Sequence, residues 1–257
     1  MRYFLEFAYK GTHYHGWQYQ PNAMSVQETL TKALKTILKK NIELVGAGRT
    51  DTGVHAKQMY AHFDLEEQID VPFYMHKLNS FLPKDIAVIN IHHVHEEAHA
   101  RFDATKRTYE YHIHTKKDAF ESDDSWYHQN ELNIEKMNEA CKILFNYTDF
   151  ECFSKVHTEV NTFNCTIYEA HWTRGKAELF ADKKDNNRLV FTISADRFLR
   201  NMVRAIVGTM VTIGLEKITI DHLNEIIKSK DRGKAGFSVP AHGLYLTKVE
   251  YPFLDNG

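Results

Sequence analysis

The stretch that decides the fold is GAGRTDTGVHA, residues 46–56, together with the strand-like segment QMYAHFDL that follows it at 58–65. Three glycines, two threonines and one arginine surround a single carboxylate, Asp51. The segment lacks the Gly-Lys-Ser/Thr ending of a P-loop, and it has Asp51 where a dinucleotide-binding GxGxxG motif has its third glycine. The pattern therefore argues against a nucleotide site and directs attention to the aspartate.

The spacing of Arg49 and Asp51 bears on the charge of that aspartate. If the segment is extended, the two side chains share one face, because alternate residues of a strand point the same way. A nearby guanidinium favours the ionised carboxylate, which is the form that a nucleophile or an electrostatic stabiliser needs. The glycines allow tight turns and a close approach of a ligand to the backbone. The spacing alone fits an aspartate that merely caps a turn equally well.

Outward from the motif, period-two alternation predicts strands and 3.6-residue periodicity predicts helices. Strands are expected at 2–10, 42–46, 58–65, 85–94, 106–116, 162–172, 188–198 and 243–251. Helices are expected at 26–40, 72–78, 133–146, 198–211 and 221–230, the first of them behind a capping box of Ser25 and Glu28. Because strands follow strands instead of alternating with helices, the sequence predicts an α+β protein with antiparallel pairing.

Composition narrows the class of protein. The chain has 257 residues, 43% of them hydrophobic, and a formal net charge of −2. Its first residues resemble no signal or transit peptide, and the longest apolar run, at 205–215, is about half a membrane span. We therefore expect a cytoplasmic protein. Three cysteines without a CxxC pair argue against disulfides and against a cysteine zinc site.

Two basic segments stand out against the nearly neutral total. Arg197, Arg200 and Arg204 have helical spacing, which suits a phosphate track or a clamp on a carboxylate as well as a solvated helix face. The segment KRTYEYH places Tyr109 beside Lys106 and Arg107, a combination that suits unpaired bases but is also ordinary strand composition. A basic groove for nucleic acid is thus compatible with the net charge.

A third motif, HEEAH at 95–99, matches the zincin pattern HExxH. Such a site needs His95 and His99 one turn apart on a helix, with Glu96 activating water. Here the motif directly follows an expected strand and no long apolar helix supports it. A metallohydrolase is therefore the least favoured alternative, and no metal site is expected.

Taken together, the sequence resembles the TruA-type tRNA pseudouridine synthases. Seven blocks match in family order over nearly the whole chain: 9–20, 25–30, 46–56, 78–86, 98–113, 198–210 and 235–249. The resemblance implies the pseudouridine synthase fold, with two similar mixed α/β subdomains, largely antiparallel sheets flanked by helices, and an active-site cleft between them. Residues 1–105 would form the N-terminal subdomain with the Asp51 loop, and residues 106–257 would complete the cleft.

The resemblance also implies the chemistry. The enzyme would isomerise uridine to pseudouridine without a cofactor, with Asp51 as the nucleophile. Arg204 would pair with that carboxylate and Arg49 would help to displace the base. Tyr109 would pack on the target base and is also a candidate for proton transfer. Substrate contacts would further involve Arg200, Lys106 and Arg107.

The partners implied are tRNA, at uridines of the anticodon stem-loop (tRNA positions 38 to 40), and a second copy of the chain in a homodimer. Neither a membrane nor a small-molecule cofactor is implied. Three positions depart from the family pattern, namely Lys10, Thr52 and Ala98. The alternative to catalysis is a tRNA-binding or tRNA-folding factor that uses the same groove and leaves every uridine unchanged.

Overall fold

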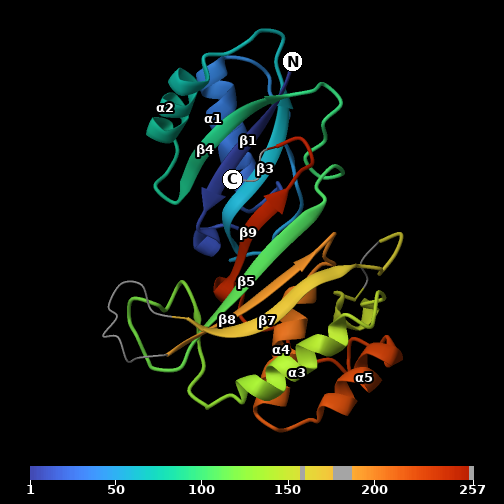
Figure 1. Ribbon diagram of the computed structural model, residues 1–257. Helices are drawn as coiled ribbons and strands as arrows, with labels where there is room; N and C mark the ends of the chain where they lie inside the picture. Colours follow the sequence, from blue (N-terminus) through green and yellow to red (C-terminus); the bar gives the residue numbers. More distant parts are fainter. Residues whose placement is uncertain (157–159, 176–186, 255–257) are drawn as a thin grey trace. The chain divides into compact units, whose positions relative to one another are not determined.

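The computed structural model describes residues 1–156, 160–175 and 187–254 (Figure 1). The chain divides into two compact units, of which the first comprises Met1–Arg107 and Tyr245–Gly257 and the second Thr108–Leu244. The sequence analysis placed a boundary between residues 105 and 106 and assigned all later residues to the second subdomain. The structure instead returns the last strand to the first unit, because that strand pairs with a strand near the Asp51 loop.

The first unit contains a sheet with two helices. Its elements are β1 (Arg2–Tyr9), α1 (Val26–Leu38), β2 (Val45–Gly46), β3 (His55–Asp64), α2 (Val71–Phe81), β4 (Ile86–Val94) and β9 (Leu244–Glu250), with a short 3-10 turn at Gly11–His13. The strand order is β4-β1-β3-β9, and β2 pairs with β3. All pairs are antiparallel except β3 with β9, which runs parallel at His55 and Ala56. In Figure 1, α1 and α2 lie beside each other along β1 and β4.

Local sequence explains these elements. The alternation predicted for residues 2–10 places Tyr3, Leu5 and Phe7 in the core, where each is at most 1% exposed. Helix α1 begins behind Ser25, whose hydroxyl accepts the Glu28 amide at 3.2 Å, so the predicted cap is confirmed. Satisfying this amide compensates for one of the donors that a helix start leaves without a partner.

The second unit also combines a sheet with helices. Its elements are β5 (Lys106–His114, of which the first two residues belong to the first unit), β6 (Trp126–Tyr127), α3 (Ile134–Leu144), β7 (Ile167–Gly175), β8 (Arg188–Ala195), α4 (Met202–Gly214) and α5 (Ile220–Ser229), with 3-10 turns at Glu151–Phe153 and Ala241–Gly243. Strand β5 pairs in parallel with the short β6 and lies next to β8, which pairs antiparallel with β7. Eleven of the thirteen residues of α4 are buried, and α3 packs against both α4 and β7.

One predicted helix begins later than expected. The prediction started it at Phe198, but α4 begins at Met202 because Asn201 has a φ of 68°, a left-handed conformation that cannot belong to the helix. Arg197 and Arg200 therefore precede the helix, and the prediction that they share a helical stripe with Arg204 is wrong. Among the residues that the structure describes, no helix combines the length and apolar character that a membrane span requires.

Candidate active site

Asp51 lies in the loop between β2 and β3, and this loop packs against the segment that follows β1. The Trp17 amide donates to the Thr50 carbonyl at 3.3 Å, and the Gly53 amide donates to the Tyr14 carbonyl at 3.3 Å. The hydroxyls of Tyr9 and Thr50 are 2.8 Å apart. Hydrogen bonds thus hold the loop on both sides of the aspartate.

Glycine makes this close packing possible. A Cβ at Gly11 would stand 1.9 Å from the Val54 carbonyl oxygen, and one at Gly16 would stand 2.3 Å from that of Thr50. Gly16 also has a φ of 84°, which side-chain-bearing residues rarely adopt. The sequence reasoning did not assign a role to this supporting segment, although it lies in the first block of the resemblance.

Two aromatic residues complete the support of the loop. Trp17 is 3% exposed and stacks on Phe7 with ring centroids 5.4 Å apart. A Cβ at Gly46 would meet the Trp17 ring at 2.5 Å, so the strand that leads to the motif lies directly on the indole. The Asp51 side chain is half-buried and Arg49 is exposed. The arrangement can therefore present a carboxylate from a backbone whose position is already fixed, which is the geometry that a nucleophile or electrostatic stabiliser requires.

The two basic residues at the start of β5 have partners within the first unit. Lys106 forms an ion pair with Glu250 at 3.4 Å. The Arg107 guanidinium donates to the carbonyls of Ala104 at 3.1 Å, Arg101 at 2.8 Å and Ala47 at 3.1 Å. Arg107 thus ties the loop before β5 to Ala47, within the Asp51 motif.

The remaining candidate residues belong to the second unit. The Tyr109 ring is half-buried and meets Phe198 edge-on, with centroids 5.1 Å apart. In the first turn of α4, the Arg204 Nε donates to the Val239 carbonyl at 2.7 Å, and the Val239 amide donates to the Arg204 carbonyl at 3.3 Å. Arg200 is exposed in the segment before α4. The structure thus groups Asp51 and Arg49 with Lys106 and Arg107 in one unit, and Tyr109 with the other two arginines in the second.

The HEEAH segment does not form the helix that a zincin needs. Residues 95–98 form a turn after β4, closed by the Ala98 amide on the His95 carbonyl at 3.0 Å, and Glu96 is exposed. Within the described ranges, no three side chains of His, Cys, Asp or Glu are placed to share a metal ion. The segment therefore gives no structural support to a metallohydrolase.

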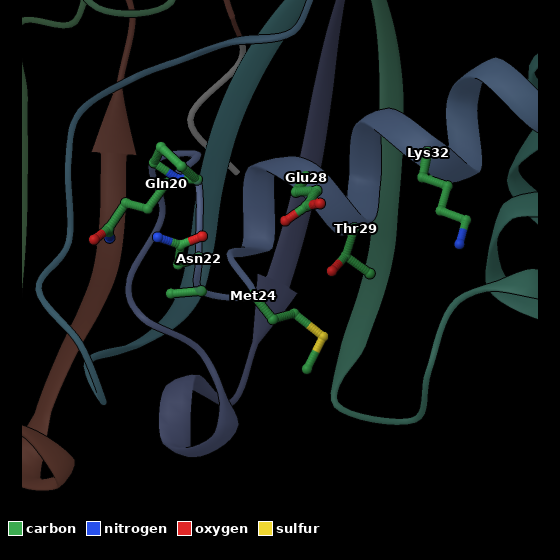
Figure 2. Close-up of a pocket in the computed structure, with 8 residues that line it drawn as sticks. Gln20, Asn22, Met24, Glu28, Thr29 and Lys32 are labelled. Carbon is green, nitrogen blue, oxygen red and sulfur yellow. The ribbon is translucent and has the colours of Figure 1, made fainter.

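An open pocket of about 440 Å³ lies beside the start of α1 (Figure 2). Its lining comes from the loop before the helix and from the exposed side of the first helical turns: Gln20, Pro21, Asn22, Ala23, Met24, Glu28, Thr29 and Lys32. The lining contains none of the residues that the sequence proposed for the site, and it mixes one acid with one base.

Comparison with known proteins decides the family. The family model described as "tRNA pseudouridine synthase" matches residues 7–103 and 140–252. The chain belongs to the tRNA pseudouridine synthase family. It is 52% identical over 252 residues to tRNA pseudouridine synthase A of Parabacteroides distasonis, covering 98% of this chain and 96% of the relative. Two further relatives have the same name. The protein from Bacteroides fragilis is 52% identical over 252 residues, which cover 98% of this chain and 96% of the relative. The protein from Porphyromonas gingivalis is 47% identical over 253 residues, which cover 98% of this chain and 97% of the relative.

The family confirms the resemblance, the predicted α+β class and the predicted activity. This synthase is an isomerase that converts uridine to pseudouridine in tRNA. The family model includes both the Asp51 loop and its supporting segment, as well as the segment with Arg200 and Arg204. The non-catalytic alternative is therefore not supported.

Proposed function

We propose that the Asp51 carboxylate is the nucleophile of the isomerisation and that the target uridines lie in the anticodon stem-loop of tRNA. The observation that supports the role of Asp51 most strongly is the fixed loop around it. Thr50 is bonded to Trp17 through its carbonyl and to Tyr9 through its hydroxyl. A carboxylate on such a loop attacks without first losing conformational freedom.

The other candidate residues have complementary roles in this proposal. Arg204 pairs with the carboxylate, Arg49 helps to displace the uracil, and Tyr109 packs on the displaced base. Its edge-on contact with Phe198 supports a fixed orientation of the Tyr109 ring. The exposed Arg200 contacts the RNA backbone, and Lys106 extends that contact.

In the first unit, Arg107 acts as a positioning residue because its guanidinium is bonded to three backbone carbonyls. A uridine within a stem must leave the base stack before it reacts, at a cost of a few kcal/mol.

We propose that two copies of the chain hold one tRNA, because a homodimer doubles the basic surface of a chain whose net charge is −2. The protein acts in the cytoplasm, without a cofactor.

The test is the Asp51→Asn variant, which preserves the shape of the side chain and removes its charge. We expect pseudouridine formation in an anticodon-arm transcript to fall by more than about 1000-fold, because the nucleophile is lost. Folding and tRNA binding are expected to remain. The matched control is Asp70→Asn, since Asp70 caps α2 by accepting the Phe73 amide at 3.1 Å and asparagine caps helices equally well.

Near-normal turnover of Asp51→Asn would contradict the proposed nucleophile. The target is tested separately, by mapping the pseudouridines that the wild-type enzyme forms in full-length tRNA. Product outside the anticodon arm would contradict the proposed target and leave the role of Asp51 intact. The mass of the protein in solution, measured by light scattering, tests the homodimer.

A further inference from the structure

A cluster of three flat groups lies at the surface of the first unit, in the loop that leads to β5. Phe102 is 73% exposed. The His99 ring contacts the Phe102 ring with centroids 4.3 Å apart and an interplanar angle of 34°. The Arg101 guanidinium carbon lies 5.5 Å from the centroid of the same ring. His99, Arg101 and Phe102 are called the ring platform below.

The backbone beneath the ring platform is firmly held. The Nδ1 atom of His99 accepts the amides of Arg101 at 3.1 Å and Phe102 at 3.3 Å. The His99 amide donates to Asp103 Oδ2 at 2.7 Å, and Arg107 donates to the Arg101 carbonyl at 2.8 Å. These bonds require His99 Nδ1 to be unprotonated, and burial lowers the pKa of His99 accordingly. The exposed ring is therefore presented from an ordered turn.

Single exposed aromatic residues are common on protein surfaces and need no explanation. The ring platform differs because its phenyl ring has a guanidinium and an imidazole as neighbours and its backbone is already ordered. A preorganised binding group loses little conformational entropy when it meets a ligand. Aromatic rings and arginine planes are the groups on which proteins stack unpaired bases.

The ring platform is also tied to the Asp51 loop. The same Nη2 atom of Arg107 that bonds the Arg101 carbonyl also bonds the carbonyl of Ala47, four residues before Asp51. One side chain therefore bonds to both loops. The carbonyls of Ala47 and Arg101 thus lie 3.1 and 2.8 Å from one guanidinium nitrogen, so the two loops are close neighbours in the first unit.

We propose that the ring platform is a second contact with the substrate, at which the Phe102 ring stacks on an unpaired nucleobase of the tRNA beside the target uridine. The inference rests on the proposed function for the position of the target uridine at Asp51 and for placing that base in the anticodon arm. The contact increases the affinity for tRNA and fixes the position of the RNA on the protein. It takes no part in the bond changes at the target base.

The test measures tRNA binding by the full-length chain with alanine, leucine or tryptophan at position 102. Dissociation constants are measured by fluorescence anisotropy in the Asp51→Asn background, so that the RNA is not converted during the titration. KM is measured with the wild-type carboxylate. We expect Phe102→Ala and Phe102→Leu to raise both constants by about 10-fold, because one base–aromatic stack is lost. Phe102→Trp should remain within about 2-fold of the parent, since it keeps a flat ring.

The matched control is Phe120→Ala, because Phe120 is 79% exposed in the second unit and outside the ring platform. Binding within about 2-fold of the parent is expected for this control. The inference is overturned if Phe102→Ala binds as tightly as the parent, or if Phe102→Leu does, which would indicate apolar contact without stacking. It is also overturned if Phe102→Ala alters the mass of the protein in solution, because the ring would then contact a protein. Pseudouridine mapping with the wild-type enzyme tests the anticodon-arm target independently, so either proposal can fail alone.

Discussion

The segments that hold Asp51 and Arg204 use glycine in different ways. In the first unit, Gly16 has a left-handed φ of 84° and a Cβ there would stand 2.3 Å from the Thr50 carbonyl oxygen. In the second unit, Gly208 lies within α4, where its conformation is that of an ordinary helix, and a Cβ would stand 1.9 Å from the Phe237 carbonyl oxygen. One glycine is thus required for conformation and space, and the other for space alone.

The surroundings of these glycines determine how a substitution is absorbed. Gly208 lies in a helix that is buried along nearly its whole length, so the helix cannot move away from Phe237. Gly16 lies in a loop beside the buried Trp17, and its segment is hydrogen-bonded to the Asp51 loop, so a displacement there passes to Thr50. We therefore expect a substitution at Gly208 to destabilise the fold, and one at Gly16 to disturb the geometry around the candidate nucleophile.

The largest effect is expected from Gly208→Ala. The added methyl overlaps a backbone carbonyl that is held by a packed helix, so the free energy of unfolding should fall by about 4 kcal/mol or more. Urea unfolding monitored by circular dichroism measures the change. A stability within about 1 kcal/mol of the wild type would show that the contact between α4 and Phe237 yields easily, and the comparison would fail.

Gly16→Ala should have a smaller effect on stability and a disproportionate effect on activity. A left-handed conformation costs alanine about 1–2 kcal/mol, and displacement of the Thr50 backbone moves the adjacent Asp51. We expect kcat to fall by about 100-fold or more while the protein stays folded. Gly48→Ala is the control for stability, because a Cβ there meets nothing within 4 Å. Unchanged kcat in Gly16→Ala would contradict the supporting role of this segment.

The smallest effect concerns stability in acid and depends on a buried histidine of the first unit. His62 of the first unit is 6% exposed, its Nδ1 accepts the Ala100 amide at 3.2 Å, and burial lowers its pKa to about 4. The unfolded chain, with a pKa near 6.5, binds the proton first as the pH falls. Stability is therefore complete above pH 6.5 and is lost between about pH 6.5 and 4, by on the order of 2 kcal/mol.

His62→Asn should remove much of this pH dependence, because an amide oxygen accepts the Ala100 amide without titrating. Urea unfolding of both proteins at pH 7.5, 6 and 4.5 measures the difference. An equal loss of stability in the two proteins would assign the acid sensitivity elsewhere, for instance to His114 of the second unit, whose pKa burial also lowers.

Local patterns predicted most elements of this fold because local interactions determine them. The alternation in residues 2–10 is that of β1 except at Phe4, which is buried as well, and Ser25 is the cap that its spacing to Glu28 predicted. The helix start at 198 was wrong for an equally local reason. Leu199 continues the apolar period of Met202 and Val203, and no pattern of side chains reports the left-handed φ of Asn201.

Long-range contacts were beyond such reasoning. The alternation of residues 243–251 predicted a strand, but not that it pairs in parallel with His55 and Ala56. The motif identified Asp51, whereas the partners of Thr50 lie more than thirty positions earlier, at Trp17 and Tyr9. From its charge, Arg107 was predicted to contact substrate. The hydrogen bond from its guanidinium to the Ala47 carbonyl is apparent only in the structure.

The return of β9 to the first unit has a consequence for synthesis. The second unit is inserted, in sequence, between Arg107 and Tyr245. A ribosome therefore releases all of the second unit before it supplies the strand that lies beside β3. The first unit must therefore wait, with the edge of β3 open, for the last residues of the chain. Early termination at residue 244 would consequently damage the unit that was made first.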